Sequence, residues 1–251
     1  PLICLIRTGV LLLSLLSTTI THTQGGARTC RERTLEAQGQ QRCTMLAVCL
    51  DLEGVLIPEI WISVAERTGI KALRRTTRDD PDYDRLMSYR IGILDQNDIK
   101  IEDITSTIDS MEPMDGALEF LQSLESRWPT LILSDTFSQF AKPIMSKLGH
   151  PTLLCHTLVI DDSGRIADWE IRYEGHKSKT VESLLEMNYH VIAAGDSYND
   201  TTMLSTASAG ILFRPPDNVV EEFPQFPVAR DYEELTAAIE SAASDLGEHW
   251  N

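Results

Sequence analysis

Short apolar runs alternate with helical patterns along most of this chain, and this alternation constrains the fold more than any other feature. The runs are "LAVCL" (46–50), "LIL" (131–133), "VIAA" (191–194) and "AGILF" (209–213). A strand that is apolar on both sides has to be covered on both faces, which is typical of a parallel sheet flanked by helices. We therefore expect an α/β fold with a Rossmann-like parallel sheet, in which "AGILF" is the last buried strand. Residues 152–172 should add extended segments around an Asp-Ser-Gly turn.

The segment after the first strand departs from this alternation. Residues 59–111 carry helical patterns and no strand of their own, and the first helix should stop at Gly69, a plausible C-cap. We interpret 59–111 as a small helical cap inserted into a catalytic core made of residues 45–58 and 112–251.

The first 44 residues differ from the remainder. "RTGVLLLSLLSTTITHT" has an Arg, a short apolar stretch and small polar residues, as in a signal peptide, and is short for a membrane span. Residues 24–44 are polar without periodicity, so 1–44 is expected to be a disordered or targeting-like extension. A translated upstream region or fragment, an organelle-targeting extension and a secretory signal all remain open. The first is favoured because Met45 directly precedes the first core strand.

Composition limits the partners of the chain. The formal net charge is −16, which argues against nucleic acid or an anionic membrane surface as a partner of the core. The cysteines are odd in number and form no CxxC pair, which favours a reducing, cytoplasmic compartment without a disulfide framework. They are Cys4, Cys30, Cys43, Cys49 and Cys155. Homodimer formation is left open by the sequence.

Polar residues gather where the predicted strands end. They are, in chain order, Asp51, Glu53, Ser134, Asp135, Lys177, Asp196, Asn199 and Asp200. The carboxyl ends of parallel strands meet at one edge of the sheet, where open α/β sheets bind their ligands. Each residue alone has an ordinary explanation as a turn, a cap or a surface charge. Together they would crowd several repelling carboxylates into one place, and a hard divalent cation such as Mg²⁺ is the usual remedy. The six histidines show no HxxxH pair, so no zinc site is expected.

At this point the residues resemble a known family. "DLEGV", "LILSDT", Lys177 and "GDSYND" stand in the order of the four motifs of haloacid-dehalogenase-type phosphatases. From Met45 to near the last helix, the chain resembles bacterial bifunctional phosphoserine phosphatase/homoserine phosphotransferase proteins still more closely than it resembles the wider superfamily. The stretches that carry this resemblance are "CLDLEGVL", "PEIW", "ILSDTF", "PTLLCH", "VIAAGDSYNDTTMLS" and "EFPQFP".

The resemblance implies a mechanism through an aspartyl phosphate. Asp51 would be the nucleophile, and Glu53 would protonate the leaving oxygen and then activate the attacking water or alcohol. Lys177 would neutralise the charge at the nucleophile and Ser134 would donate to a phosphoryl oxygen. Mg²⁺ would lie on Asp51, on the backbone carbonyl of Glu53 and on Asp196, with Asp200 holding the waters of the metal or Lys177.

The resemblance also implies how substrate is bound. Glu59 would meet the ammonium group of phosphoserine, and Arg90 on a cap helix would bind its carboxylate in a bidentate fork. Asp135 and Asn199 complete the implied substrate contacts, beside Ser134 and Lys177. Without the resemblance, Glu59 and Arg90 would be interpreted as surface charges.

One departure from the wider superfamily falls on Glu53, where most members have Asp. The extra methylene changes the acid/base geometry, and we hypothesise that it lets an alcohol such as homoserine accept the phosphoryl group. Two other functions stay open at this stage: a phosphatase of another small phosphate ester, and a receiver-like signalling module that accepts a phosphoryl group on Asp.

Overall fold

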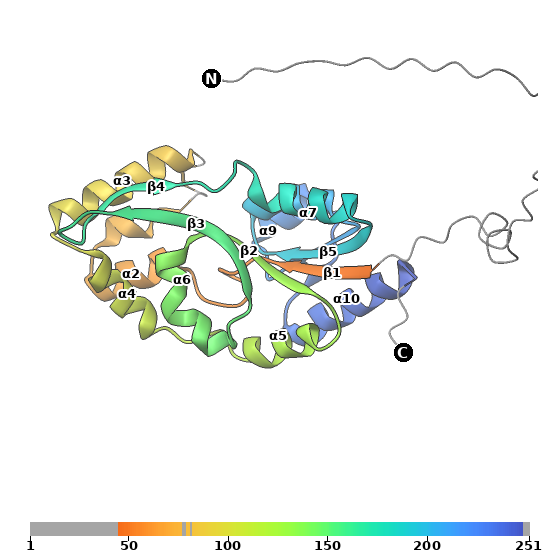
Figure 1. Ribbon diagram of the computed structural model, residues 1–251. Coiled ribbons are helices and arrows are strands. Elements are labelled where there is room, and N and C mark those ends of the chain that lie inside the picture. Colours follow the sequence, from red (N-terminus) through yellow and green to blue (C-terminus); the bar gives the residue numbers. More distant parts are fainter. Residues whose placement is uncertain (1–44, 77–78, 81, 248–251) are drawn as a thin grey trace, which may run out of the picture. The chain divides into compact units, whose positions relative to one another are not determined.

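The computed structural model describes residues 45–76, 79–80 and 82–247, so the extension expected at 1–44 lies outside the described residues. The described chain forms a sheet of seven strands in the order β4-β3-β2-β1-β5-β6-β7 (Figure 1). The strands are β1 (Met45–Leu50), β2 (Thr130–Phe137), β3 (Thr152–Ile160), β4 (Ile166–Glu170), β5 (Tyr189–Gly195), β6 (Ala209–Phe213) and β7 (Val228–Ala229). All neighbouring pairs are parallel except β3 and β4, which are antiparallel. The predicted α/β class is confirmed.

Helices connect the strands and cover both faces of the sheet. In the core these are α5 (Ala117–Glu125), α6 (Ser138–Met145), α7 (His176–Glu186), α8 (Thr201–Thr206), α9 (Asp217–Glu222) and α10 (Tyr232–Asp245). Two short 3₁₀ segments, η2 (Ser146–Leu148) and η3 (Tyr198–Asp200), follow α6 and precede α8. In Figure 1, α7 lies on one side of β1 and β5, and α5 and α10 lie on the other.

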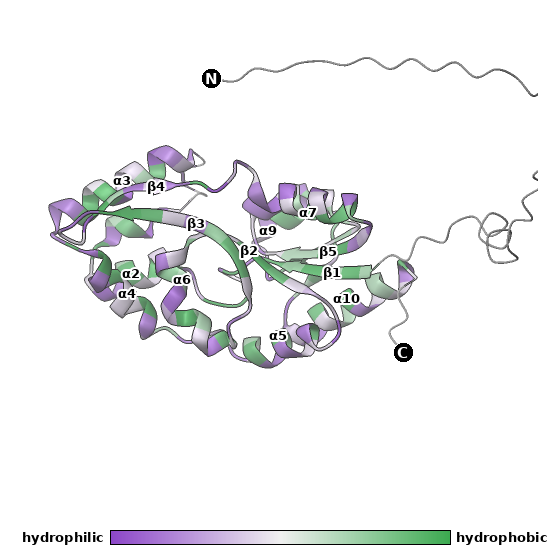
Figure 2. Cartoon of the chain, in the orientation of Figure 1, coloured by the Kyte–Doolittle hydropathy of each residue, from purple (hydrophilic) through white to green (hydrophobic). Residues whose placement is uncertain are grey.

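The central strand shows why both faces need cover. Leu46, Val48 and Leu50 of β1 belong to the apolar cluster that includes α5 and α10, whereas Ala47 and Cys49 belong to the cluster that includes α7 and α8. Side chains alternate across a strand, so β1 supplies apolar groups to both layers. Figure 2 shows β1 green along its length, while the helices carry both colours. Cys49 and Cys155 are buried free thiols, as expected for the part of the chain that the structure describes.

Two details of the sheet differ from the expectation. The prediction that "AGILF" is the last strand was wrong, because β7 follows β6 and pairs with it through Leu212 and Phe213. A strand of two residues is too short to carry a periodic signal. The Asp-Ser-Gly turn is present, but the hairpin it makes adds an antiparallel strand to a sheet expected to be parallel. Oδ1 of Asp161 accepts hydrogen bonds from the backbone N–H groups of Ser163 (2.8 Å) and Arg165 (2.9 Å) in this turn.

Between β1 and α5 the described residues form α2 (Ile60–Thr68), η1 (Lys71–Arg74), α3 (Tyr83–Gln96) and α4 (Ile101–Asp109), with no strand among them. We propose that residues 59–111 are the cap, as the sequence predicts. Its two connections to the core lie side by side, because the backbone N–H of Met114 donates to the carbonyl of Leu56 (3.0 Å). The β3–β4 turn contacts the start of α4, since Ile101 N–H donates to the Gly164 carbonyl (2.9 Å).

Candidate active site

The carboxyl ends of β1, β2 and β5 bring the predicted residues into one pocket. Its walls include nine of the residues that the sequence singled out: Asp51, Glu53, Glu59, Arg90, Ser134, Asp135, Lys177, Asp196 and Asn199. The tenth, Asp200, is fully buried and bonded to Lys177. Sequence reasoning missed several further lining residues: Trp61, Thr76, Tyr83, Thr136, Phe137 and Ser197. Cap residues such as Tyr83 carried no local signal, because only the folded chain places α3 over the end of β2.

Lys177 is the central cation of this pocket. Its Nζ donates to Oδ1 of Asp51 (2.8 Å) and to Oδ1 of Asp200 (2.8 Å), and lies 3.4 Å from Oδ2 of Asp135. Burial alone would lower the pKa of Lys177, but Asp200, Asp51 and Asp135 together raise it well above its usual value. The ammonium group is therefore charged at neutral pH and holds the carboxylate of Asp51 in one orientation.

Lys177 is surrounded by more carboxylates than its single positive charge can neutralise. One carboxylate oxygen from each of Asp51, Asp196 and Asp200 lies within 4.8 Å of the others, and all three residues are buried. Burial, then the charge of Asp200 and of Asp196, raises the pKa of Asp51 well above its usual value despite the opposing effect of Lys177. This excess of buried negative charge and the oxygen donor set fit a hard divalent cation.

Asp200 differs from the other two acids in its hydrogen bonds. Its Oδ2 accepts from the backbone N–H groups of Asp196 (3.0 Å) and Ser197 (3.2 Å), while Oδ1 accepts from Lys177. Both oxygens thus already have donors, so this residue is suited to hold Lys177 and the Asp196 loop.

Glu53 lies between the core and the cap. Its Oε2 accepts a hydrogen bond from the backbone N–H of Ile60, the first residue of α2, at 2.8 Å. Burial, followed by the nearby charge of Glu59, raises the pKa of Glu53 to about 7, although the Ile60 N–H and Arg90 act in the opposite direction. A carboxyl group that titrates near neutral pH is suited to general acid–base chemistry.

Arg90 comes from α3 and enters the pocket almost completely buried. Its guanidinium carbon lies 4.5 Å from the ring centroid of Trp61, and its Nη2 donates to the carbonyl of Arg75 (2.8 Å). Burial lowers the pKa of Arg90 to about 10, so the group is still charged at neutral pH. Its Nε has no hydrogen-bond partner, which leaves a buried donor available to an anionic ligand.

Gly54 allows the turn between Asp51 and the cap. Its φ is +79°, and a Cβ at this position would lie 2.5 Å from Oδ2 of Asp196. We expect Gly54→Ala to displace that carboxylate and to lower the free energy of unfolding by roughly 1–3 kcal/mol through backbone strain. Activity and Mg²⁺ affinity, measured by titration of phosphate release, should both fall.

Gly69 offers a matched control for this substitution. Its φ is +72°, and nothing lies within 4 Å of an added Cβ. Gly69→Ala should therefore lower the melting temperature with little change in activity. Equal loss of activity in both variants would contradict the role given to the close contact between Gly54 and Asp196.

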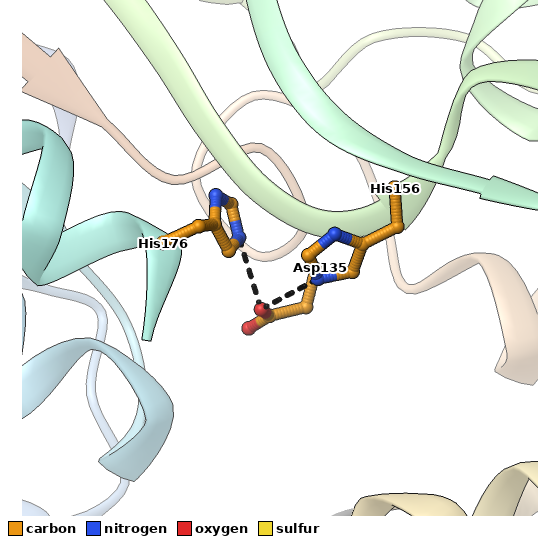
Figure 3. A group of neighbouring side chains, drawn as sticks. All are labelled: Asp135, His156 and His176. Atoms are coloured by element: carbon orange, nitrogen blue, oxygen red, sulfur yellow. Dashed lines mark hydrogen bonds and ion pairs between the residues drawn. The ribbon is translucent and has the colours of Figure 1, made fainter. Parts of the chain in front are cut away.

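Asp135 has a second set of partners on the other side from Lys177. Figure 3 shows the rings of His156, from β3, and His176, from α7, both directed at its carboxylate. Nε2 of His176 lies 3.1 Å from Oδ1 of Asp135, and Nε2 of His156 lies 3.6 Å from the same oxygen. These histidines are 20 residues apart in sequence, so the spacing of the histidines gave no indication that the two rings meet.

This site lies at the carboxyl edge of a mostly parallel sheet, with Asp51 directly after the first strand. Residues 50–205 match the haloacid dehalogenase-like hydrolase family. The chain belongs to this family. It is 54% identical over 200 residues to phosphoserine phosphatase ThrH of Pseudomonas aeruginosa. The match covers 80% of this chain and 98% of that protein. It is also 52% identical over 201 residues to a phosphoserine phosphatase of Pseudomonas syringae pv. tomato, covering 80% and 84% of the two chains.

Solved structures share the fold at lower sequence identity. The solved structure of a phospho-aspartyl intermediate analogue of phosphoserine phosphatase has a TM-score of 0.64 at 20% identity. The match covers 77% of this chain and 98% of that one. A substrate-bound phosphoserine phosphatase gives a TM-score of 0.63 at 19% identity, covering 78% and 99%. Within residues 45–247, gaps aside, no helix is both long and apolar enough to cross a membrane.

Proposed function

We propose that this protein is a Mg²⁺-dependent phosphoserine phosphatase that works through an aspartyl phosphate on Asp51. The observation that carries the proposal is the buried contact between Lys177 and Asp51 beside two further acids, in a pocket that Arg90 of α3 also lines. Two relatives more than 50% identical to this chain are phosphoserine phosphatases, which supports the substrate assignment.

The residues divide the reaction into two steps. The Asp51 carboxylate attacks phosphorus, the bond to the serine oxygen breaks, and Glu53 gives its proton to that oxygen. In the second step Glu53, now ionised, takes a proton from water, which attacks the aspartyl phosphate and regenerates Asp51. Ser134 and Lys177 donate to the phosphoryl oxygens as charge develops.

Asp51, Asp196 and the backbone carbonyl of Glu53 would hold the metal, with Asp200 supporting Asp196 and Lys177. When bound, Mg²⁺ draws negative charge from the phosphoryl oxygens and offsets the acids that surround Asp51. Asn199 lines the same pocket and is proposed to contact the phosphoryl group or its bound water.

The amino-acid part of the substrate requires one cation and one anion in the pocket. Arg90 supplies a buried guanidinium with an unpaired Nε, which suits a carboxylate, and Glu59 supplies a carboxylate for the ammonium. A sugar phosphate has neither charge beside its phosphate, so it would leave Arg90 unmatched.

A substrate series tests this assignment directly. Phosphate release should be faster from phosphoserine than from phosphoethanolamine, which lacks the carboxylate, and faster than from glucose 6-phosphate. Arg90→Lys should raise the KM for phosphoserine by about tenfold or more, because the bidentate fork is lost, and leave the KM for phosphoethanolamine nearly unchanged. A preference for the sugar phosphate, or equal KM changes for both amino compounds, would contradict the assignment.

Adding homoserine and measuring phosphohomoserine tests the transfer activity hypothesised for Glu53.

The pH dependence should report the protonation of Glu53. Because its pKa is raised to about 7, we expect kcat/KM for phosphoserine to decline as the pH rises above this value and the acid form disappears. Glu59→Gln removes a charge that raises this pKa, so the decline should begin at lower pH. p-Nitrophenyl phosphate is the control, since its leaving group needs no proton. An unchanged midpoint in Glu59→Gln would argue against Glu53 as the titrating acid.

Four expectations stay predictions: the division that makes residues 59–111 a cap, a cytoplasmic location, a homodimer, and transfer to homoserine. Membership of a hydrolase family argues against the alternative that this chain is a receiver-like signalling module. A phosphatase of another small phosphate ester is the remaining alternative, and the substrate series above distinguishes it.

A further inference from the structure

The group formed by Asp135, His156 and His176 lies beside the pocket, and the reaction described above uses neither imidazole. Both histidines are buried, and with Asp135 they place three ligand atoms within 4.8 Å of one another. Two interpretations are available: a site for a transition metal, and a hydrogen-bonded support for the Asp135 carboxylate. The protonation of His156 separates them.

The backbone N–H of Arg172 donates to Nδ1 of His156 at 3.2 Å, so Nδ1 is an acceptor and the ring proton is on Nε2. That Nε2–H faces Oδ1 of Asp135. A metal on Nε2 would require the proton to move to Nδ1, where it would point at the Arg172 N–H. The arrangement therefore matches two imidazole donors around a carboxylate.

We propose that His156 and His176 are positioning residues for phosphoryl transfer, which hold the Asp135 carboxylate so that it in turn holds Lys177 at the nucleophile. This role rests on the proposed phosphatase function. Oδ1 of Asp135 faces the two imidazoles and Oδ2 faces Lys177, so the carboxylate has a different partner on each side. Its backbone is held independently, because the hydroxyl of Tyr83 donates to the Asp135 carbonyl at 3.1 Å.

The device solves an electrostatic problem of the pocket. Asp135 lines the same pocket as Ser134, where a phosphate dianion is expected, and a carboxylate free to rotate there would repel that dianion. The two imidazoles lie at Oδ1 of Asp135, and Oδ2 is the third carboxylate oxygen near the Lys177 ammonium, beside those of Asp51 and Asp200. Loss of an imidazole should thus disturb Lys177 and weaken phosphate binding together.

The test is a set of variants in the full chain, assayed with phosphoserine in saturating Mg²⁺. His176→Leu should lower kcat by about tenfold, whereas His176→Gln, whose amide can donate from nearly the same position as Nε2, should stay within about threefold of wild type. The inhibition constant of inorganic phosphate should rise in His176→Leu. His190→Leu, near the opposite end of β5, is the control and should leave both values unchanged. Thermal melting with Mg²⁺ identifies any variant that fails to fold, in which case His156→Leu with His156→Gln replaces that pair.

A double-mutant cycle distinguishes this role from a general structural one. In an Asp135→Asn background, His176→Leu should change kcat by less than about twofold, because the carboxylate it serves is already gone. A tenfold effect that persists in that background would overturn the proposal, as would a stoichiometric Zn²⁺ bound by wild type and lost in both His176→Leu and His156→Leu. An active wild type with unaffected histidine variants overturns this role alone. A wild type that releases phosphate from no ester overturns the proposed function and this role together.

Discussion

Asp51→Asn should reduce phosphate release from phosphoserine by a factor on the order of 10⁴ or more, because it removes the nucleophile on which the phosphoryl group is carried. The amide keeps the size of the side chain, and its oxygen can still accept the hydrogen bond that Lys177 donates to Asp51. It also removes one of the acids that repel one another at this site, so we expect the variant to stay folded. Steady-state assays with phosphoserine give the rate, and thermal melting gives the stability.

A matched control for this variant is Asp162→Asn, since Asp162 is exposed in the β3–β4 turn. It should keep the full wild-type rate. If Asp51→Asn retained more than about a hundredth of the wild-type rate, the covalent step would need another nucleophile, and the assignment of Asp51 would fail.

Lys177→Met should affect both activity and stability. Met fills the space of the Lys177 side chain without its charge. The substitution therefore leaves Asp51, Asp200 and Asp135 without the cation that they surround. Removing one partner of a buried ion pair costs about 3–5 kcal/mol of unfolding free energy. We expect kcat to fall by about 10²–10³-fold as well, since one preorganised donor to the developing charge is lost. Chemical denaturation and steady-state kinetics measure the two effects.

Lys179→Met provides the control on the same helix. Lys179 is half-exposed and pairs with Glu182 at the surface, where an ion pair contributes about 0–1 kcal/mol. This variant should be close to wild type in both measurements. Similar losses of stability in Lys177→Met and Lys179→Met would mean that the carboxylates around Lys177 do not depend on its charge.

The sheet and the acidic edge could be predicted from the sequence because each depends on local patterns and one rule of topology. Wholly apolar runs indicate strands covered on both sides, and parallel strands bring their carboxyl ends together. Asp51, Ser134 and Asp196 follow or end such runs, so their meeting could be predicted without knowing any contact. The roles of Glu59 and Arg90, by contrast, came from the family resemblance, since nothing in their own neighbourhoods distinguishes them from surface charges.

Other features depend on distant parts of the chain and left no local signal. His156 reaches Asp135 only because β3 pairs with β2, with a register shift between Leu133 and Phe137. His176 reaches it because α7 begins directly beside that point. The raised pKa of Glu53 depends on burial beneath the cap and on the charge of Glu59, neither of which can be read from spacing. Such environments arise from tertiary packing and so require the structure.

An aspartyl phosphate on Asp51 can be detected on the enzyme itself. Wild-type protein mixed with radiolabelled phosphoserine and Mg²⁺ would be quenched in acid within one turnover, digested, and its labelled peptide identified by mass spectrometry. We expect label on the peptide that contains Asp51, released by hydroxylamine as for an acyl phosphate and missing in Asp51→Asn. Turnover with no labelled peptide, or label on His156 or His176, would contradict it.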